Sequence, residues 1–419
     1  MPKSAAIVSA VDPYPTNAGK KVVLAGFNDY FADRLGATNV HYLMVGGKAG
    51  STFPVQLHPL PRPHPVSAVG GVLTRTATGR ASIQESLLGS RTVRTTIRRT
   101  LAHLDPDLEV YDTIRMAQHA PTDRRGAQVC YLDDLFSERY RSMLGAADRY
   151  PGVDIDPLGN FATHVPRPLR PLAAGRSGQR LLLTIERNLV RRSEHRDATR
   201  FSTSLLLNEA EAQLLRNRLD TNPGRVSSIP PLIVAPSVSR AYCGRPEFVF
   251  LGLLSLPHND DGLRSFLSDV WPRVRSARPD ATLRVIGRDP RPGLIDAVAR
   301  HGDSVILEGF IPDLDAVLSR AAALVNPLRF GSGIKLKIIE ALGRGLPIIS
   351  TTVGADGVAT GEDAGILVAD DQLEMAEQLL ELTNARRNVA LSVAAHEHFV
   401  RSYSRAAVFD CYDKAFGLR

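Results

Sequence analysis

One stretch of this sequence decides the fold: Asn326-Pro-Leu-Arg-Phe-Gly-Ser-Gly-Ile-Lys-Leu-Lys-Ile-Ile-Glu-Ala-Leu-Gly-Arg-Gly-Leu-Pro-Ile-Ile-Ser350. It predicts the end of a strand, a glycine turn, a helix, a glycine stop and a second buried strand. We expect Gly331, Ser332 and Gly333 to open the helix, whose first backbone amides have no partner within the helix. Free amides at the positive end of a helix dipole form a binding site for an anion.

The first turn of the expected helix carries charges that suit a nucleotide. Lys335 and Lys337 lie where cations disfavour an isolated helix, which indicates a negative ligand, most naturally a diphosphate. Glu340 follows Lys337 by three residues, so both side chains project from one helix face. We expect phosphates on the amides and lysines, and ribose hydroxyls on Glu340. The alternative is a glycine-capped helix with a solvated Lys–Glu pair, since short glycine motifs are common.

The composition predicts a soluble chain of two or three domains. Its 419 residues exceed the usual size of one domain, and 43% of them are hydrophobic. We find no run of 18 apolar residues that would span a membrane, and residues 1–11 do not resemble a signal peptide. Cys130, Cys243 and Cys411 lie far apart, which predicts neither a disulfide framework nor a metal site. We therefore expect a cytoplasmic protein.

The order of apolar and polar segments predicts two α/β halves with parallel sheets. In the second half we expect strands at 247–254, 281–287, 305–310, 323–327, 347–351 and 366–369, and helices at 261–277, 293–301 and 314–322. In the first half we expect strands at 5–11, 41–45, 108–111, 128–132 and 204–207, a long helix at 180–200, and a proline-rich loop at 58–65. The halves join near residues 236–246, and 401–416 form a last helix. Such doubly wound domains bind ligands at the carboxyl ends of their strands.

The quoted stretch closely resembles the donor-site segment of GT-B glycosyltransferases, especially the large retaining family 4. There the pattern is roughly G-[ST]-G-[IT]-[KR]-x-K-[IV]-[IL]-E-A-x-x-x-G-x-P-[IV]-[IV]-[AS]-[ST]. The resemblance covers roughly residues 247–360 and includes Phe250-Leu-Gly-Leu-Leu-Ser-Leu-Pro-His-Asn-Asp-Asp-Gly-Leu263. It also includes the glycine loop Val285-Ile-Gly-Arg-Asp-Pro290 and the turn Glu308-Gly-Phe-Ile-Pro-Asp313, which in the family meets the nucleotide base.

The resemblance implies a GT-B fold, with two Rossmann-like doubly wound domains that face each other across a cleft. The N-terminal domain, 1–240, would bind the acceptor, and the C-terminal domain, 241–400, the nucleotide-sugar donor. The final helix, within 401–419, would cross back to the N-terminal domain. In the donor domain it implies contacts from Gly331, Ser332, Gly333, Glu340, Arg288, Phe310 and Ile311, with Lys335 and Lys337 stabilising the departing diphosphate.

Two departures from the family pattern concern the donor site. The family usually has a Glu eight residues before the helix Glu, where this chain has Ser332, so the sugar contacts differ. Many members also place an Arg and a Lys after the first C-terminal strand, in the region of Leu254 and Asn259 here. We therefore expect Lys335, Lys337 and either Arg329 or Arg264 to neutralise the phosphates, with Asn259 as a further contact.

The resemblance is thinner in the first half. Pro13-Tyr-Pro-Thr-Asn-Ala-Gly-Lys20 stands where the family has a glycine loop near the donor phosphates, which makes Gly19 and Lys20 candidates unless the segment is an ordinary turn. Tyr111-Asp-Thr-Ile-Arg-Met-Ala-Gln-His119 and Val129-Cys-Tyr-Leu-Asp-Asp-Leu-Phe-Ser-Glu-Arg-Tyr140 resemble stretches that reach the ligands. From these we expect Asp112, His119 and Asp134 as catalytic candidates and Arg115 as an acceptor contact.

Two of these candidates have a structural alternative. Adjacent residues of an extended segment point to opposite sides, so only one of Asp133 and Asp134 should face the ligands. We expect Asp134 there and Asp133 as a cap for the helix near Ser137. For His119, a structural role and a catalytic role are equally compatible with the sequence.

The charge is unevenly distributed. Residues 1–240 carry 31 Lys and Arg against 21 Asp and Glu, a net +10, whereas 241–419 carry 20 against 23, a net −3. A basic half favours an anionic partner, but we find no nucleic-acid-binding signature, so we expect no nucleic acid. An anionic membrane surface or a lipid-diphosphate acceptor fits better. Arg91, Arg94, Arg98 and Arg99 follow helical spacing and can form such a patch, unless they are only a solvated face.

These observations predict a glycosyltransferase that moves a sugar from a UDP, GDP or dTDP sugar to a lipid-linked, polysaccharide or other sugar acceptor. The family implies retention of configuration, and the absence of a D-x-D motif placed to hold a divalent cation predicts no metal and no further cofactor. It would work in the cytoplasm, with contact to the inner membrane face. The alternatives are another GT-B enzyme, such as an epimerase or a synthase, a non-catalytic sugar-nucleotide-binding subunit, and, last, a nucleic-acid-binding protein.

Overall fold

The computed structural model describes residues 1–47, 53–124, 126–150, 176–219, 223–234, 240, 242–311 and 313–418. They form two compact units. The first contains the described residues up to 144, those from 176 to 232, and 408–418; the second contains 145–150 and those from 233 to 407. Within the described residues, no helix combines the length and the apolar character needed to cross a membrane.

The first unit is built on a seven-stranded sheet in which every strand pair is parallel. The strand order is β3-β2-β1-β4-β5-β6-β7. The strands are β1 (Ala5–Ser9), β2 (Val40–Val45), β3 (Gln56–Leu60), β4 (Leu108–Asp112), β5 (Ala127–Asp133), β6 (Thr203–Leu206) and β7 (Val226–Ser228). The order reverses between β1 and β4, which creates a switch point where doubly wound sheets bind ligands.

The proline-rich segment differs from the prediction. Residues 58–60 lie in β3, which pairs with β2, and only 61–64 are loop. Pro59 is tolerated because β3 is an edge strand, where a missing amide leaves no neighbour unpaired. Pro65 then begins helix α2 (Pro65–Gly71), a position that needs no amide hydrogen.

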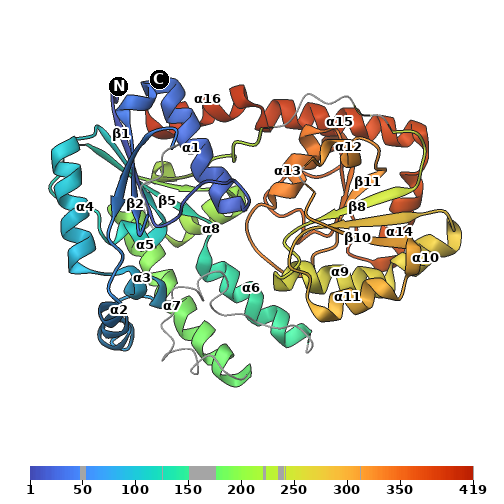
Figure 1. Cartoon of the computed structure of the whole chain (residues 1–419), viewed down its shortest axis with the longest axis horizontal. Coiled ribbons are helices and arrows are strands. Elements are labelled where there is room, and N and C mark those ends of the chain that lie inside the picture. The colour runs from blue at the N-terminus through green and yellow to red at the C-terminus, as the bar shows by residue number, and fades with distance from the viewer. Residues whose placement is uncertain are drawn as a thin grey trace. The chain divides into compact units, whose positions relative to one another are not determined.

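The helices of the first unit cover this sheet. They are α1 (Gly19–Leu35), α2, α3 (Ile83–Leu88), α4 (Arg91–Leu104), α5 (Thr113–Ala117), α6 (Phe136–Arg149), α7 (Arg176–Arg200), α8 (Glu209–Arg218) and α16 (Arg405–Phe416). Helix α16, at the red end of the chain in Figure 1, lies beside α1. Phe27 and Tyr30 of α1 pack edge-on against Tyr412 of α16, with ring centroids 5.5 Å and 5.1 Å apart.

The second unit has a six-stranded parallel sheet, ordered β10-β9-β8-β11-β12-β13. Its strands are β8 (Glu247–Leu251), β9 (Thr282–Ile286), β10 (Val305–Gly309), β11 (Ala323–Asn326), β12 (Ile348–Ser350) and β13 (Ile366–Val368). Its helices are α9 (Pro257–Asp269), α10 (Trp271–Ala277), α11 (Pro292–Ala299), α12 (Asp315–Leu318), α13 (Leu336–Gly343), α14 (Gln372–Glu381) and α15 (Ala385–Tyr403). The helix predicted at 261–277 is two helices, because Pro272 starts α10 anew. The predicted class, two doubly wound parallel sheets, is confirmed.

Candidate functional site

Three loops of the second unit are joined at the carboxyl ends of its central strands. The amide of Gly252 donates to the carbonyl oxygen of Ile286 at 3.1 Å, and the amide of Gly287 donates to that of Gly309 at 2.8 Å. A Cβ added to Gly287 would lie 1.8 Å from the carbonyl oxygen of Gly252, so only glycine permits this approach. The loops after β8, β9 and β10 therefore form one continuous backbone surface.

The glycine segment precedes the helix rather than opening it, which corrects the prediction. Helix α13 begins at Leu336 with Lys335 as its N-cap residue. Gly331 and Gly333 have φ angles of 138° and 69°, which no α-helical residue adopts. Gly331, Ser332 and Gly333 are thus a loop between β11 and α13, and the first-turn amides belong to residues that follow Lys335.

Lys335 shapes this glycine loop. Its Nζ donates to the carbonyl oxygen of Ser332 at 3.0 Å and to that of Gly333 at 2.6 Å. Two carbonyls are thereby held against the ammonium group at the start of α13. The loop keeps a positive charge at its centre, which suits an anionic ligand.

Lys337 is a half-buried cation with neutral contacts. Its Nζ donates to Oδ1 of Asn259 at 3.2 Å and lies 4.3 Å from the centroid of the Phe250 ring. Burial, with a smaller effect of the Lys335 charge, lowers its pKa to about 7. No carboxylate of the described residues lies within ion-pair distance of it. Within the described part of the chain, Lys337 is therefore a cation that lacks a compensating negative charge.

Glu340 lies one turn further along the same face of α13. Burial raises the pKa of its carboxyl group, and the charge of Arg344 opposes this shift. Arg344 itself donates to the carbonyl oxygen of Glu340 at 3.0 Å and to Oδ1 of Asp315 at 2.9 Å. No hydrogen bond to the Glu340 carboxylate comes from the described residues, so its oxygens are open to a pair of hydroxyl donors.

The two arginines expected to help the lysines neutralise phosphates form ion pairs with aspartates. Arg329 makes a bidentate pair with Asp261 at 2.8 Å and 2.5 Å, and Arg264 pairs with Asp260 at 3.0 Å. The prediction that either one neutralises phosphates is therefore not supported by the structure. Asn259, by contrast, is well placed: its amide also donates to the carbonyl oxygen of Leu253 at 2.9 Å, which fixes its oxygen toward Lys337.

The remaining donor candidates lie after β9 and β10. The guanidinium of Arg288 lies 5.6 Å from the centroid of the Phe310 ring, and 63% of Phe310 is exposed. Ile311, the next residue in the chain, is half-buried. An exposed aromatic ring beside a guanidinium is an arrangement on which a nucleotide base can stack.

In the first unit, Lys20 lies between two carboxylates at the carboxyl ends of β4 and β5. Gly19 is the exposed first residue of α1, and Lys20 follows it. The Lys20 ammonium pairs with Asp112, lies 3.3 Å from Oδ2 of Asp133 and stands 4.3 Å from the Tyr131 ring centroid. We call this group of one lysine and two carboxylates, Lys20, Asp112 and Asp133, the carboxylate triad.

Neighbouring hydroxyls fix this triad. Oγ of Ser9 donates to Asp112 at 2.7 Å, and the Tyr131 hydroxyl donates to Asp133 at 2.6 Å. Burial acts to raise the pKa of Asp133, but Lys20 and the Tyr131 hydrogen bond outweigh it and lower that pKa. Asp112 is buried, whereas 15% of the Asp133 side chain is exposed. Asp133 is thus the ionised carboxylate of the triad that reaches solvent.

Backbone strain marks the same place. Thr113 and Asp133, at the ends of neighbouring strands β4 and β5, have φ angles of 63° and 75°. Non-glycine residues pay about 1–3 kcal/mol for such conformations, which cluster at functional sites. The register between β5 and β6 also shifts between Tyr131 and Asp133. This bulge breaks the alternation of side chains on which the choice of Asp134 rested.

The other candidates of the first unit have partners outside the triad. Asp134 is buried and pairs with Arg139 of α6 at 2.5 Å, so Asp133, rather than Asp134, is the aspartate that lies beside Lys20. His119 is buried, and one of its nitrogens lies 3.0 Å from the carbonyl oxygen of Leu88. Burial lowers its pKa to about 4, which favours the structural reading of this residue. Arg115 donates to Oγ1 of Thr113 at 2.8 Å and lies over the Phe136 ring.

Comparisons with known proteins agree with this geometry. Residues 245–385 match the family described as glycosyl transferases group 1. A curated relative, an uncharacterized 44.6 kDa protein in the cps region of Klebsiella pneumoniae, is 25% identical over 149 residues. That match covers 34% of this chain and 37% of the length of the relative.

Solved structures share the fold over almost the whole chain. WaaG, a glycosyltransferase involved in lipopolysaccharide biosynthesis, is similar with a TM-score of 0.60 and 15% identity, over 99% of this chain and 100% of WaaG. HepE of Anabaena in complex with UDP is similar with a TM-score of 0.62 and 11% identity, over 99% of each chain.

Two doubly wound units of this kind define the GT-B class of glycosyltransferases. The chain has that fold, and residues 245–385 of its second unit match glycosyl transferases group 1. The predicted family resemblance is confirmed.

Proposed function

We propose that this protein transfers a glycosyl group from a nucleoside-diphosphate sugar to a sugar acceptor. The observation that carries the proposal is Lys337, a half-buried ammonium at the start of α13 whose partners among the described residues are an amide and an aromatic ring. A cation kept in such surroundings favours an anionic ligand. Glu340, on the same helix face, is open to two hydroxyls, as a ribose would supply.

The chemistry we propose is stabilisation of the leaving group. As the bond to the sugar breaks, the diphosphate gains negative charge, and donors already directed at it lower the barrier. Lys337, Lys335 and the amides at the start of α13 supply these donors. We propose that they balance the charge without a divalent cation, and that configuration is retained, as the family resemblance implies.

The nucleotide we propose first is UDP. HepE, which shares the fold, was crystallised with UDP, and GDP and dTDP remain the alternatives to compare. Phe310 and Arg288 would contact the base, and the loops joined at Gly252, Gly287 and Gly309 would line the diphosphate.

The acceptor we propose is a sugar of a polysaccharide or lipid-linked precursor. The relative from a cps region supports a role in surface polysaccharide synthesis. The carboxylate triad would accept a hydrogen bond from the reacting hydroxyl. Helix α4 exposes Arg91, Arg94, Arg98 and Arg99, and we propose that this face contacts an anionic membrane surface from the cytoplasmic side.

Thermal unfolding with nucleotides tests the donor site. We expect UDP, GDP or dTDP at 100 times its dissociation constant to stabilise the protein by about 2.7 kcal/mol, with and without magnesium. Lys337→Ala should abolish the shift, whereas Lys414→Ala, on the exposed surface of α16, should preserve it. A protein that responds to no nucleoside diphosphate would not have this function. Release of the nucleotide from its sugar conjugate only when acceptor is present would separate transfer from epimerisation and from binding alone.

A further inference from the structure

The N-terminus of α4 has an unusual charge distribution. Ser90 is its N-cap residue, yet its side chain caps no amide, and the first turn contains no acidic residue. The first turn instead contains Arg91 and Arg94, which oppose the helix dipole of a 14-residue helix. The positive end of α4 is therefore uncapped and carries added positive charge.

A third arginine reaches the same point from another element. Arg75 lies in a short π-helical turn, Val72–Thr76, and its guanidinium packs against Gly89, just before α4. A Cβ on Gly89 would lie 2.0 Å from Nη1 of Arg75, so a side chain at this position would displace the guanidinium. Turns of this type occur often at functional sites.

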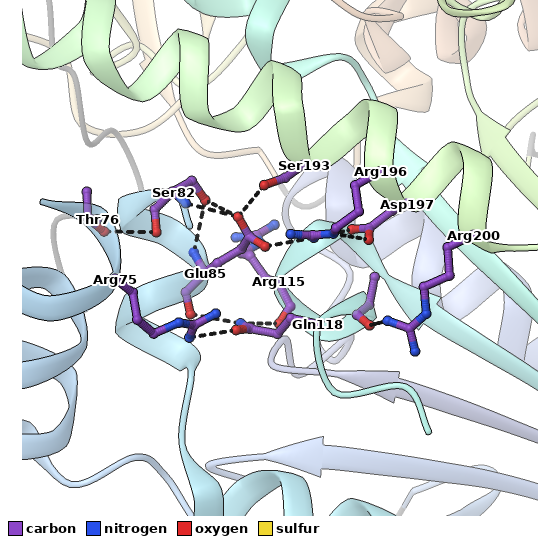
Figure 2. Close-up of polar contacts among 11 residues, drawn as sticks. Arg75, Thr76, Ser82, Glu85, Arg115, Gln118, Ser193, Arg196, Asp197 and Arg200 are labelled. Carbon is purple, nitrogen blue, oxygen red and sulfur yellow. Dashed lines mark hydrogen bonds and ion pairs between the residues drawn. The ribbon is translucent and has the colours of Figure 1, made fainter. Parts of the chain in front are cut away.

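Arg75 forms no ion pair with a described carboxylate, in contrast to Arg196 of the same cluster (Figure 2). Its guanidinium donates a hydrogen bond to the neutral Oε1 of Gln118 at 3.1 Å. In the same cluster, Arg196 pairs with Glu85 at 2.9 Å and with Asp197 at 2.8 Å, which consumes both carboxylates. No described carboxylate lies within ion-pair distance of Arg75 or Arg94. Burial lowers the pKa of Arg75, and the charges of Arg94 and Arg196 add to this against an opposing effect of Glu85.

A buried unpartnered atom lies in the same neighbourhood. His119 is 1% exposed, and its Nε2 donates to the carbonyl oxygen of Leu88, while Nδ1 has no hydrogen-bond partner in the described structure. The charges of Arg94 and Arg75 both act on this ring, after burial, to lower its pKa. When Nε2 carries the proton, Nδ1 is an acceptor that the O–H of a monoprotonated phosphate would satisfy.

We propose that Arg75, Arg94 and the N-terminus of α4 bind a phosphate group of the acceptor. The inference rests on the proposed function and narrows the acceptor to a phosphorylated or diphosphate-linked sugar. Gln118, the partner of Arg75, follows α5, and α5 begins directly after Asp112 of the triad. The five residues of α5, which span about 8 Å, thus separate Asp112 from Gln118. We propose that one short acceptor places its phosphate at Arg75 and a hydroxyl near the triad.

Two kinds of ligand could supply the phosphate at this site: a sugar diphosphate and a phospholipid head group. Inorganic pyrophosphate serves as the probe for the first, and vesicles of phosphatidylglycerol and phosphatidylcholine for the second. The protein is first saturated with UDP so that the donor site is occupied, and pyrophosphate is then titrated by calorimetry. We expect a second binding event that Arg94→Gln weakens at least about tenfold, the equivalent of one charged hydrogen bond.

Arg94 is exposed and its side chain bonds to nothing in the described structure, so Arg94→Gln should fold normally. Arg75→Gln provides the second variant, and Arg99→Gln, exposed on the same helix, is the matched control. Equal losses in Arg94→Gln and Arg99→Gln, or vesicle binding with no response to pyrophosphate, would overturn the phosphate site and leave only a basic surface. The absence of any response to UDP would refute the donor site and not the phosphate site, because UDP binding does not involve Arg94.

Discussion

Lys337 is the residue whose protonation should report on the donor site. With a pKa near 7 it is largely neutral at pH 8, and a bound diphosphate would raise that pKa by supplying the missing negative charge. We expect the uptake of close to one proton per nucleotide at pH 8. Calorimetry in buffers of different ionisation enthalpy measures this uptake. Lys337→Met should abolish it, and uptake that persists in the variant would assign the proton to another group.

The same residue should cost the free protein stability. The unfolded chain binds a proton at Lys337 up to pH 10.5, whereas the folded protein releases it near pH 7, so stability rises with pH across this window. Lys337→Met should therefore stabilise the ligand-free protein at pH 7 by about 1–2 kcal/mol, as often happens at functional sites. Urea unfolding measures the change, and destabilisation would show that the ammonium is well compensated.

Asp133 and Asp134 are adjacent but should respond differently to substitution. Asp133→Asn removes the solvent-reaching carboxylate of the triad, and we expect kcat to fall by about 100-fold while UDP still stabilises the protein. Asp134→Asn weakens the pair between a buried carboxylate and the partly exposed Arg139, and we expect a loss of about 1–2 kcal/mol in the free energy of unfolding. Activity assays and urea unfolding of both variants separate the two roles. Comparable losses of kcat would refute the assignment.

At the scale of the elements, α7 holds two other helices through buried carboxylates. Glu186 accepts hydrogen bonds from the amides of Ile83 and Gln84 at 2.7 Å and 3.2 Å, at the start of α3. Glu194 accepts one from the amide of Ser137 at 3.0 Å, at the start of α6. Burial is the main cause that raises the pKa of each to about 7.

These carboxylates should make stability fall as the pH rises from 4.5 to 7. In that window the folded protein keeps protons that the unfolded chain has released, so each unit of pH costs stability. Glu186→Gln should remove part of this slope, while Glu186→Ala should also lose the cap and cost about 1–2 kcal/mol. Glu397→Gln, exposed on α15, is the control. Unfolding followed from pH 4.5 to 7.5 checks the sign.

The elements that the sequence predicted well are those with a strong local signal. The strands of the second unit are continuous apolar runs between helices, and all six were found within a few residues of their predicted bounds. The start of α13 was missed because glycines at positive φ resemble a helix opening when only the composition is known. Pro59 was missed because the sequence does not show that its strand lies at an edge.

The candidate site divides in the same way. Lys337 and Glu340 lie on one face of α13 as the motif indicated, and Asn259, in the first turn of α9, accepts a hydrogen bond from Lys337. The positions of Asp133 and Arg75 depend on tertiary structure. A bulge in β5 turns Asp133 toward Lys20, and Gly89, in a separate loop, leaves room for the Arg75 guanidinium. No periodicity in the sequence reports a bulge or a contact between separate loops.

At the scale of the molecule, the first unit depends on the last helix. Tyr412 is fully buried among α1 aromatics, and Asp413 accepts from the Tyr30 hydroxyl at 2.9 Å and pairs with Arg34. Tyr412→Ala should cost about 3–5 kcal/mol and should lower the unfolding transition of the first unit alone. Calorimetry with UDP, which we expect to stabilise the second unit, distinguishes the two transitions. A single transition that UDP shifts as a whole would show instead that the units unfold together.

Helix α16 also affects the order in which the chain can mature on the ribosome. Synthesis usually lets the domain made first fold first. Here the strands of the first unit emerge early, but the rings of Phe409, Tyr412 and Phe416 that complete their core are translated after the whole second unit. The second unit is nearly continuous in sequence and can fold before α16 has been made. During that time Phe27 and Tyr30 of the first unit remain exposed. A nascent chain of this protein should therefore offer its early half, rather than its late half, to chaperones.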